Sequence, residues 1–427
     1  MTAADHVQVA YVDRRSHAVE DYLSALREQW TWVNGSIPDG DPAIPSLGVG
    51  MLGHGFMGKA HAHALHTVAY MAWPPPLRPR LVELVGRRPE AVVEAARRYG
   101  FERATTDWRV LVEDPSIQLF DNTGPNDLHC EPTLAALRAG KHVLCEKPLG
   151  RSAAESHEIW QAAVAARVVH MCGFNYRFVP AVRLARELIG EGEIGELLGF
   201  HGLYLQDWLA DPQSPYVWRL DRQRAGSGAL GDIGAHVVDL ARFLVGEIAA
   251  VSGRVRTVVP ERPGGLVDVD DTVEALVEFE HGAGGTISAS RLAQGRRNSL
   301  TFEVSGTRGS IAFDLERMNE LEIYVAGTRP GRRAQGFRRV LVTERDHPYL
   351  EHWWPPGHVP GWGDTFVHEI HHLLSAIAGD GHVAPYGATF EDGYRVAEVC
   401  DAILRSSEQR AWQRVAYLDA TDTAGIG

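Results

Sequence analysis

The sequence is poor in cysteine and has no long uninterrupted apolar segment. Its four cysteines form neither a C-x-x-C pair nor a regular spacing, which argues against a disulfide framework or a zinc knuckle. No apolar run approaches the roughly 18 residues that a membrane-spanning helix needs. Residues 1–29 also lack the apolar core of a signal peptide. These absences predict a cytoplasmic protein that does not engage a membrane.

An excess of positive charge is absent as well. The formal net charge is −13, and arginines gather only in short pairs such as Arg87-Arg88 and Arg296-Arg297. Nucleic-acid binding normally uses a clustered basic face, so nucleic acid is not an expected partner. The hydrophobic fraction of 44% and the charged fraction of 23% are ordinary for a globular chain. A chain of 427 residues is long enough for two or three domains.

Between residues 47 and 172, short apolar runs alternate with segments of helical periodicity. This alternation predicts an α/β fold in which a doubly wound parallel sheet carries helices on both faces. Residues 1–46 are expected to form an N-terminal extension with one helix at 18–32. The expected strands are Leu47–Leu52, Leu81–Val85, Ile117–Phe120, His142–Cys145 and Val168–Cys172, and the expected helices are Pro89–Tyr99, Pro132–Ala139 and Ala153–Ala166.

The pattern changes at about residue 173, where strand-like runs with period-two alternation begin. Such runs predict a second, α+β domain over residues 173–410, built on a large and mainly antiparallel sheet. Two helices, Asp364–Ala378 and Phe390–Ser407, are expected to close this domain, and residues 411–427 to form a tail. The expected strands are Leu197–Leu205, Ala249–Val259, Thr272–Phe279, Gly285–Ser290, Leu300–Ser305 and Ser310–Leu315.

A glycine-rich segment directly follows the first expected strand. It reads Gly53-His54-Gly55-Phe56-Met57-Gly58, the G-x-G-x-x-G pattern, and a helix-compatible run follows. Between a strand and a helix, such glycines permit a tight turn and let the backbone approach a pyrophosphate at the helix N-terminus. The segment therefore predicts a Rossmann dinucleotide-binding domain. It also matches the start of a P-loop, but Ala60 lacks the hydroxyl that holds magnesium there, so we reject that interpretation.

The end of the second expected strand bears on the choice between NAD and NADP. An acidic residue at this place accepts hydrogen bonds from the ribose 2′-hydroxyl of NAD. Here Gly86 occupies the tip and Arg87 and Arg88 follow, which favours the 2′-phosphate of NADP and leaves NAD possible. Two alternatives stay open. The arginines could be only the solvated start of the next helix, or Glu83 could serve the ribose if the strand ends early.

Two further motifs carry side chains suited to chemistry. Glu146-Lys147-Pro148 ends a parallel strand, where open α/β sheets bind ligands, although the tripeptide alone fits a surface turn equally well. Asp232 and His236 stand four apart on an expected helix, so their side chains are neighbours. A carboxylate beside an imidazole is expected to raise its basicity and poise it for proton transfer near neutral pH. The alternative is a helix cap beside an ordinary buried histidine.

In this order and spacing, the three motifs resemble those of the Gfo/Idh/MocA oxidoreductase family. The resemblance spans about residues 47–410. Longer stretches, His170–Arg177, Tyr204–Trp208 and Ala225–Gly246, resemble the levoglucosan dehydrogenase-like branch of that family. The resemblance implies oxidation of a secondary hydroxyl of a sugar, whether a pyranoside, an anhydrosugar or a glycoside, to a keto-sugar by hydride transfer to NAD(P). It also implies a homodimer or a homotetramer.

The resemblance assigns roles to individual residues. Lys147, Asp232 and His236 would be catalytic and would also contact the sugar. The remaining sugar contacts would come from Asn175, Tyr176, Arg177, Gln206 and Trp218. Beyond the glycine segment and the two arginines, the cofactor contacts would come from Pro125, Asn126, His129, Glu146, Lys147, Trp218 and Arg219. Gly86 at the acidic position, Gly124 where relatives often carry threonine, and the extension all depart from the family pattern.

Three other activities fit the same residues. The enzyme could keep its cofactor and exchange hydride between two sugars, or it could reduce a keto-sugar. A nucleotide-sensing regulator is disfavoured because Lys147 and His236 are both present.

His368, Glu369 and His372 match the H-E-x-x-H signature of zinc proteases. No third ligand stands at a matching spacing, so we expect neither a protease nor a catalytic metal, and a structural or adventitious metal site is the more plausible alternative to a protease.

Overall fold

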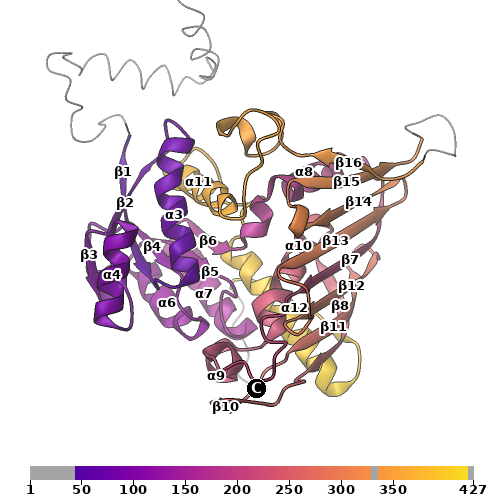
Figure 1. Cartoon of the computed structure of the whole chain (residues 1–427), viewed down its shortest axis with the longest axis horizontal. Helices are drawn as coiled ribbons and strands as arrows, with labels where there is room; N and C mark the ends of the chain where they lie inside the picture. The colour runs from indigo at the N-terminus through magenta and orange to yellow at the C-terminus, as the bar shows by residue number, and fades with distance from the viewer. Residues whose placement is uncertain (1–43, 328–334, 422–427) are drawn as a thin grey trace, which may run out of the picture.

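The computed structural model describes residues 44–327 and 335–421, so the helix expected at 18–32 lies outside the described residues. The first domain is a six-stranded parallel sheet in the order β3-β2-β1-β4-β5-β6, with helices on both faces (Figure 1). Its strands are β1 (Ser46–Leu52), β2 (Arg78–Val85), β3 (Arg103–Thr105), β4 (Leu119–Asn122), β5 (His142–Glu146) and β6 (His170–Gly173). Its helices are α3 (Phe56–Met71), α4 (Pro89–Tyr99), α5 (Arg109–Glu113), α6 (Cys130–Arg138) and α7 (Ala153–Ala166).

The sheet forms as the sequence predicts because its central strands are apolar on both faces. In β1, every residue from Leu47 to Leu52 is buried, as expected for a strand covered by helices on both sides. The strand order reverses between β1 and β4, since β1 pairs with β2 on one side and with β4 on the other. The carboxyl ends of the strands at such a switch point leave a crevice for a ligand. The expected α/β class is confirmed.

The second domain is built on a nine-stranded sheet in the order β16-β15-β14-β13-β7-β12-β11-β8-β17. Adjacent strands are antiparallel except β12 and β7, which are parallel. Its strands are β7 (Leu197–Leu205), β8 (Ile248–Arg256), β11 (Thr272–Phe279), β12 (Gly284–Ser290), β13 (Ser299–Gly306), β14 (Gly309–Asp314), β15 (Glu320–Val325), β16 (Arg338–Leu341) and β17 (Gln413–Arg414). A short hairpin, β9 (Glu261–Arg262) with β10 (Gly265–Leu266), stands apart from this sheet.

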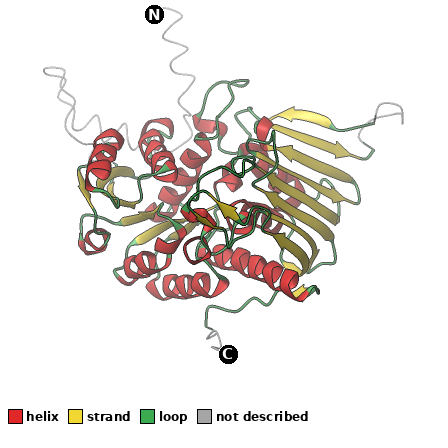
Figure 2. Cartoon of the chain, turned by 60° about the horizontal axis from the view of Figure 1, so that its bottom comes forward, coloured by secondary structure: helices red, strands yellow, loops and turns green. Residues whose placement is uncertain are grey.

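Helices cover one face of the large sheet, as Figures 1 and 2 show. The helices of this part of the chain are α8 (Pro180–Gly190), α9 (Arg222–Ala225), α10 (Ala235–Leu244), α11 (Asp364–Ala378) and α12 (Phe390–Gln409). Alternate residues of β11, from Val273 to Phe279, are buried against this layer while the glutamates between them are exposed. This period-two pattern made the strand predictable from the sequence.

The last third of the chain returns to the first domain. Helix α11 packs against α3, and α12 packs against both α7 and β8. Helix α12 thus packs on the second domain as expected, while apolar side chains of α11 such as Phe366 and Ile370 belong to the core around β1. Residues 413–414 add β17 to the large sheet, so this part of the chain is not a free tail. Within residues 44–327 and 335–421, no helix has the length and apolar character to span a membrane.

Candidate active site

The glycine segment forms the turn between β1 and α3. Gly53 has a φ of +103°, and a Cβ there would lie 2.6 Å from the Thr123 carbonyl oxygen. A Cβ on Gly58 would lie 2.3 Å from the Gly53 carbonyl oxygen, so this glycine lets the helix pack against the turn. Around Gly55 there is open space, and no side chain caps the helix that starts there. The backbone N–H groups of that first turn are therefore accessible to an anionic group.

The tip of β2 carries no free carboxylate. Glu83 is buried within the strand, and its Oε2 lies 3.1 Å from Nε of Arg103 on β3. The alternative that Glu83 serves a ribose is therefore disfavoured. Gly86 is buried against the His54 ring, with only 2.3 Å between a Cβ built there and the ring Cδ2. Arg87 and Arg88 are both exposed at this tip.

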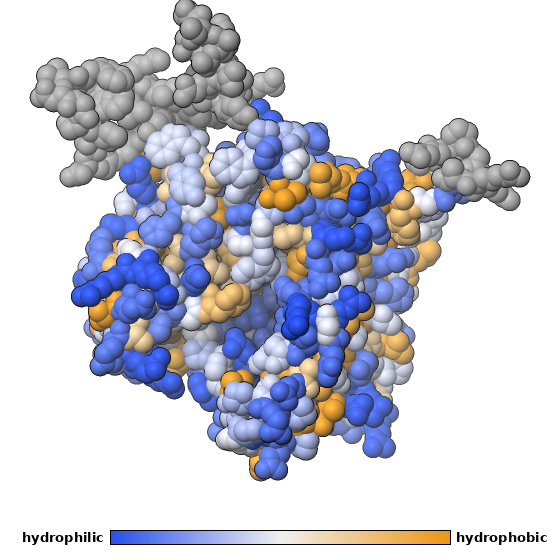
Figure 3. All heavy atoms as spheres, viewed as in Figure 1, coloured by the Kyte–Doolittle hydropathy of each residue, from blue (hydrophilic) through white to orange (hydrophobic). Residues whose placement is uncertain are grey.

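Lys147 and Asp232 meet between the two domains. Lys147 follows β5, and its Nζ donates a hydrogen bond to the Asp232 carbonyl oxygen at 2.6 Å and lies 3.6 Å from Asp232 Oδ1. Asp232 sits in a π-helical turn, Leu230–Gly234, that leads into α10. His236 lies in the first turn of α10 and is buried. The structure thus brings together the three side chains that the sequence proposed as catalytic. Figure 3 shows that the molecule is hollowed between the two domains.

Three cations surround the Asp232 carboxylate. Besides Lys147, Arg219 Nε lies 3.7 Å from Oδ1, and Arg291 Nη1 lies 3.6 Å from Oδ2. Burial by itself would raise the pKa of Asp232, but Lys147, Arg219 and Arg291 outweigh it and lower the pKa to about 2. Asp232 therefore stays ionised throughout the neutral range.

The expected effect of Asp232 on His236 is corrected. Burial lowers the pKa of His236, the nearby Lys147 ammonium lowers it further, and Asp232 only partly opposes them, so the pKa lies well below 6.5. The imidazole is neutral at pH 7 and its Nδ1 has no hydrogen-bond partner within the described part of the chain. A neutral, buried imidazole with a free nitrogen can accept a proton from a bound hydroxyl group.

A polar and aromatic wall flanks His236. The Tyr176 ring lies 4.7 Å from the His236 ring, and its hydroxyl lies 2.7 Å from that of Tyr204. Tyr204 donates to Asn298 Oδ1 at 2.6 Å, and Gln206 Nε2 donates to the same oxygen at 2.8 Å. Two of these four side chains, Tyr176 and Gln206, were proposed from the sequence as sugar contacts. Their hydroxyl and amide groups are of the kind that hydrogen-bonds to sugars.

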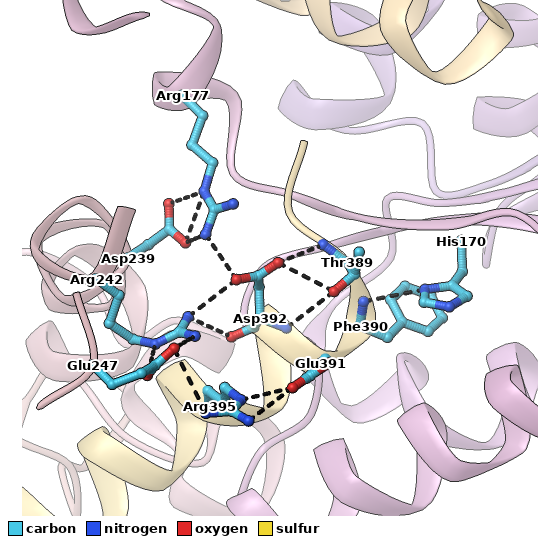
Figure 4. Close-up of polar contacts among 10 residues, drawn as sticks. All are labelled: His170, Arg177, Asp239, Arg242, Glu247, Thr389, Phe390, Glu391, Asp392 and Arg395. Carbon is cyan, nitrogen blue, oxygen red and sulfur yellow. Dashed lines mark hydrogen bonds and ion pairs between the residues drawn. The ribbon is translucent and has the colours of Figure 1, made fainter. Parts of the chain in front are cut away.

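Two other residues proposed as sugar contacts, Arg177 and Asn175, are buried in the core. The Arg177 guanidinium pairs with Asp239 on α10 and Asp392 on α12. These groups belong to an ion-pair network between the two helices (Figure 4). We therefore correct the proposal of Arg177 as a sugar contact, because in the core its Nε and Nη2 donate to these two carboxylates. Asn175 is also buried and donates to Thr365 Oγ1 at 3.0 Å.

The remaining proposed cofactor contacts lie around the same crevice. His129 is buried and bridges two turns, with Nδ1 2.7 Å from the Pro148 carbonyl oxygen and Nε2 3.1 Å from that of Gly124. Asn126 donates to the Ala225 carbonyl oxygen at 2.9 Å and so joins the two domains. The guanidinium of Arg219 stacks over the Trp218 ring at 4.4 Å. The Glu146 carboxylate is buried and faces α3 rather than the crevice.

Sequence reasoning missed several residues of the site. Tyr204 was signalled by period two, since it lies on β7 two residues before Gln206, which directly follows that strand. Arg291 had no local signal, because it follows β12 and meets Asp232 only where that strand packs against the π-helical turn, far apart in the sequence. Trp362 donates through Nε1 to the Tyr176 hydroxyl at 3.4 Å and stacks on Phe56 of the glycine segment. It comes from a distant loop that showed no pattern.

The H-E-x-x-H segment lies in α11, whose apolar side chains belong to the first domain's core. His368 Nδ1 is 2.9 Å from the Phe178 carbonyl oxygen, and His372 Nε2 is 2.8 Å from that of Val383. Glu369 points into the core, where it is fully buried. Within the described residues, no group of three or more potential ligands is arranged to hold a metal ion.

Comparison with known families agrees with this architecture. Residues 47–174 match the model of the oxidoreductase family with an NAD-binding Rossmann fold, and residues 182–312 match the GFO/IDH/MocA C-terminal domain. Together these matches cover more than half of the chain. The chain belongs to the Gfo/Idh/MocA oxidoreductase family.

The chain is also similar to individual members of this family. The chain is 46% identical over 88% of its length to all of the levoglucosan dehydrogenase of Pseudarthrobacter phenanthrenivorans. The structure of a levoglucosan dehydrogenase in complex with NADH and levoglucosan superposes with a TM-score of 0.84 at 47% identity, covering 87% of this chain and 100% of that one. The inositol 2-dehydrogenase of Rhizobium meliloti is 27% identical over 84% of this chain and 97% of its own length. The chain is an oxidoreductase of this class.

Proposed function

We propose that the chain oxidises one secondary hydroxyl of a pyranose-type sugar, an anhydrosugar such as levoglucosan in particular, to a ketone, with a nicotinamide dinucleotide as hydride acceptor. The observation that carries the proposal is the meeting of Lys147, an ionised Asp232 and a neutral His236 beside a wall of hydroxyl and amide groups. The 46% identity with a levoglucosan dehydrogenase supports the choice of sugar.

The glycine segment suits the dinucleotide. The open space at Gly55 and the uncapped first turn of α3 would admit a pyrophosphate that a side chain at this position would obstruct. When bound, the nicotinamide would accept a hydride from the carbinol carbon of the sugar. The exposed Arg87 and Arg88 at the tip of β2 favour NADP through charge-assisted hydrogen bonds to a 2′-phosphate. NAD is the competing cofactor, since a related structure was solved with NADH.

The chain's own residues would handle the proton. His236 is neutral and accepts the hydroxyl proton as the carbinol carbon loses its hydride. The Lys147 ammonium stabilises the negative charge that develops on the same oxygen. Asp232 remains a carboxylate, holds Lys147 in place and keeps the site from being purely cationic. The products are a keto-sugar, the reduced dinucleotide and one proton.

The test is the absorbance of reduced nicotinamide, measured with purified protein, with NAD or NADP, and with a panel of levoglucosan, pyranoses, methyl glycosides and inositols. We expect reduction with anhydrosugars or pyranosides, and faster turnover with NADP. If no pair reacts but nucleotide copurifies with the protein, hydride exchange or keto-sugar reduction replaces the proposal. Faster turnover with NAD would overturn the cofactor proposal alone.

A further inference from the structure

A buried cluster of charged groups lies directly behind the Lys147 turn. His61 comes from α3, Asp121 from the end of β4 and Glu146 from the end of β5. Their exposed fractions are 0%, 0% and 3%, so water does not screen the cluster. None of the steps proposed above for the sugar uses these side chains.

Both ring nitrogens of His61 face a carboxylate. Nδ1 lies 2.9 Å from Asp121 Oδ1, and Nε2 lies 3.0 Å from Glu146 Oε1. A neutral imidazole has a single N–H and can donate only one of these hydrogen bonds, whereas an imidazolium donates both. Burial would lower the pKa of His61, but the hydrogen bonds and charges of Asp121 and Glu146 hold it well above 6.5. The pair of carboxylates thus shares one buried cation.

Glu369, on α11, packs against the same cluster and carries no charge. Burial raises its pKa well above the usual range, which nearby Glu146 and Asp121 reinforce and His61 opposes. Neither of its oxygens has a hydrogen-bond partner in the described residues. One turn earlier on α11, the Phe366 ring lies 5.5 Å from the His61 ring. The charges in contact are therefore two carboxylates and one imidazolium.

The cluster connects the cofactor loop with the catalytic lysine. Glu146 Oε2 accepts a hydrogen bond at 3.2 Å from the backbone N–H of Lys147, while Oε1 is held by His61. His61 lies one and a half turns into α3, the helix that begins at the glycine segment. The position of that helix is thus fixed relative to the turn that carries the Lys147 ammonium.

We propose that His61 is a positioning residue whose imidazolium ties α3 to the Glu146–Lys147 turn and so sets Lys147 against the dinucleotide loop. The inference rests on the proposed function, because the role of Lys147 is to stabilise charge on the reacting oxygen. His61 contacts neither the sugar nor the reacting atoms.

The first variant is His61→Gln, which keeps one donor of similar size and removes the cation. We expect kcat to fall by on the order of ten- to a hundredfold, the cost of a small misplacement of a catalytic group, with a much smaller change in cofactor affinity. Two unshielded carboxylates then face each other and take up a proton as the pH falls. The kcat deficit should shrink at acidic pH, and His61→Gln/Asp121→Asn should lose that pH dependence.

Glu369→Gln is the matched control, because the amide replaces an acid that is already neutral. It is as deeply buried as His61 and should leave kcat and its pH profile unchanged. If His61→Gln does not fold, Asp121→Asn serves instead. It removes one of two counterions, so the pKa of His61 falls and kcat should decline at a lower alkaline pH than in the wild type. An Asp121→Asn enzyme with a wild-type profile would overturn the proposal.

A measurement without substrate separates this inference from the proposed function. Nitrogen NMR of the wild-type protein labelled at histidine should show one doubly protonated imidazole that persists to alkaline pH. That signal should be absent from His61→Gln and should titrate earlier in Asp121→Asn. If no sugar is oxidised, the proposed function fails while this result still reports the state of His61. No persistent imidazolium, or a His61→Gln enzyme with wild-type kcat and pH profile, overturns the proposal.

Discussion

The side chains of the site differ from one another chiefly in their charge. Lys147, Arg219 and Arg291 supply three cations against one carboxylate, Asp232, and His236 is neutral among them. An excess of positive charge around a reacting oxygen favours the alkoxide that hydride transfer requires. This balance leads to two predictions, and the exposed arginines at the tip of β2 lead to a third.

Replacing Lys147 by methionine keeps the length of the side chain and removes its charge. We expect kcat to fall by on the order of a hundredfold or more, because the ammonium that would stabilise the charge on the reacting oxygen is lost. Cofactor affinity, followed by protein fluorescence, should remain measurable. A Lys147→Met enzyme with near wild-type turnover would exclude the assigned role.

The pH profile should report His236. Because its pKa is lowered, kcat/KM should stay constant down to below about pH 6.5, the ordinary value for histidine, and then fall as the imidazole gains a proton. In Asp232→Asn the carboxylate that raises the pKa of His236 is gone. The fall of the residual activity on the acid side of the profile should therefore shift to a still lower pH. A shift toward higher pH would contradict this charge balance.

The two arginines at the tip of β2 should determine the use of NADP. The double variant Arg87→Ala/Arg88→Ala should lower kcat/KM for NADP by about 10- to 100-fold, the worth of one charge-assisted hydrogen bond, and leave NAD nearly unaffected. Arg97→Ala, an exposed arginine at the other end of α4, is the control. Equal losses with both cofactors would show that the two arginines do not act through the 2′-phosphate.

At the scale of elements, two short turns build the site. The glycine turn before α3 needs a positive φ at Gly53 and close contact at Gly58. The turn at Asp232 is π-helical rather than α-helical, so the expected regular helix from Asp232 to His236 is interrupted by a wider turn. Such turns are frequent at functional sites because they redirect a side chain without ending the helix.

The glycine turn allows a paired test. In Gly58→Ala the new methyl meets the Gly53 backbone, so we expect a loss of about 1–3 kcal/mol of stability together with weaker cofactor binding. In Gly55→Ala the methyl enters open space, so the melting temperature should hold while the cofactor KM rises. Melting curves and cofactor titrations of both variants check this. An unchanged KM in Gly55→Ala would mean that the pyrophosphate lies elsewhere.

At the scale of the whole molecule, the end of the chain holds the two domains together. Asp392 on α12 meets Arg177 after β6 and Arg242 on α10, the helix that carries His236 (Figure 4). Burial would raise the pKa of Asp392, but the two arginines lower it to about 2. The network thereby fixes α10 against α12 and against the segment that follows β6.

Asp392→Asn should lower the free energy of unfolding by about 3–5 kcal/mol at neutral pH, because two buried guanidiniums lose their shared carboxylate. Since the folded-state pKa is depressed, this contribution is present above the unfolded value near pH 4 and is lost as the pH falls toward 2. Denaturant unfolding at several pH values measures it, with the exposed Asp380→Asn as control. A pH-independent difference would exclude an electrostatic origin.

The resemblance to a known family suggested the three catalytic side chains, and the sequence by itself determined the order of the two folds, most strands and the glycine turn. These follow from local pattern: buried runs, period-two alternation and glycines at fixed spacing are properties of neighbouring residues. β15 and β16 were not predicted, although Leu321, Ile323 and Val325 of β15 follow the same period-two alternation. Strands such as Thr272–Phe279 were predicted to the residue because each alternate position is buried.

Only the tertiary structure decided which side chains face the site. Arg177 is no longer proposed as a sugar contact, because its guanidinium pairs with Asp239 on α10 and Asp392 on α12. Arg291 meets Asp232 because β12 packs against the π-helical turn, and α11 packs against α3 of the first domain. The low pKa of His236 depends on burial and on Lys147, which lies 89 positions earlier in the chain. Charge and burial are sums over such distant contacts, which no local pattern contains.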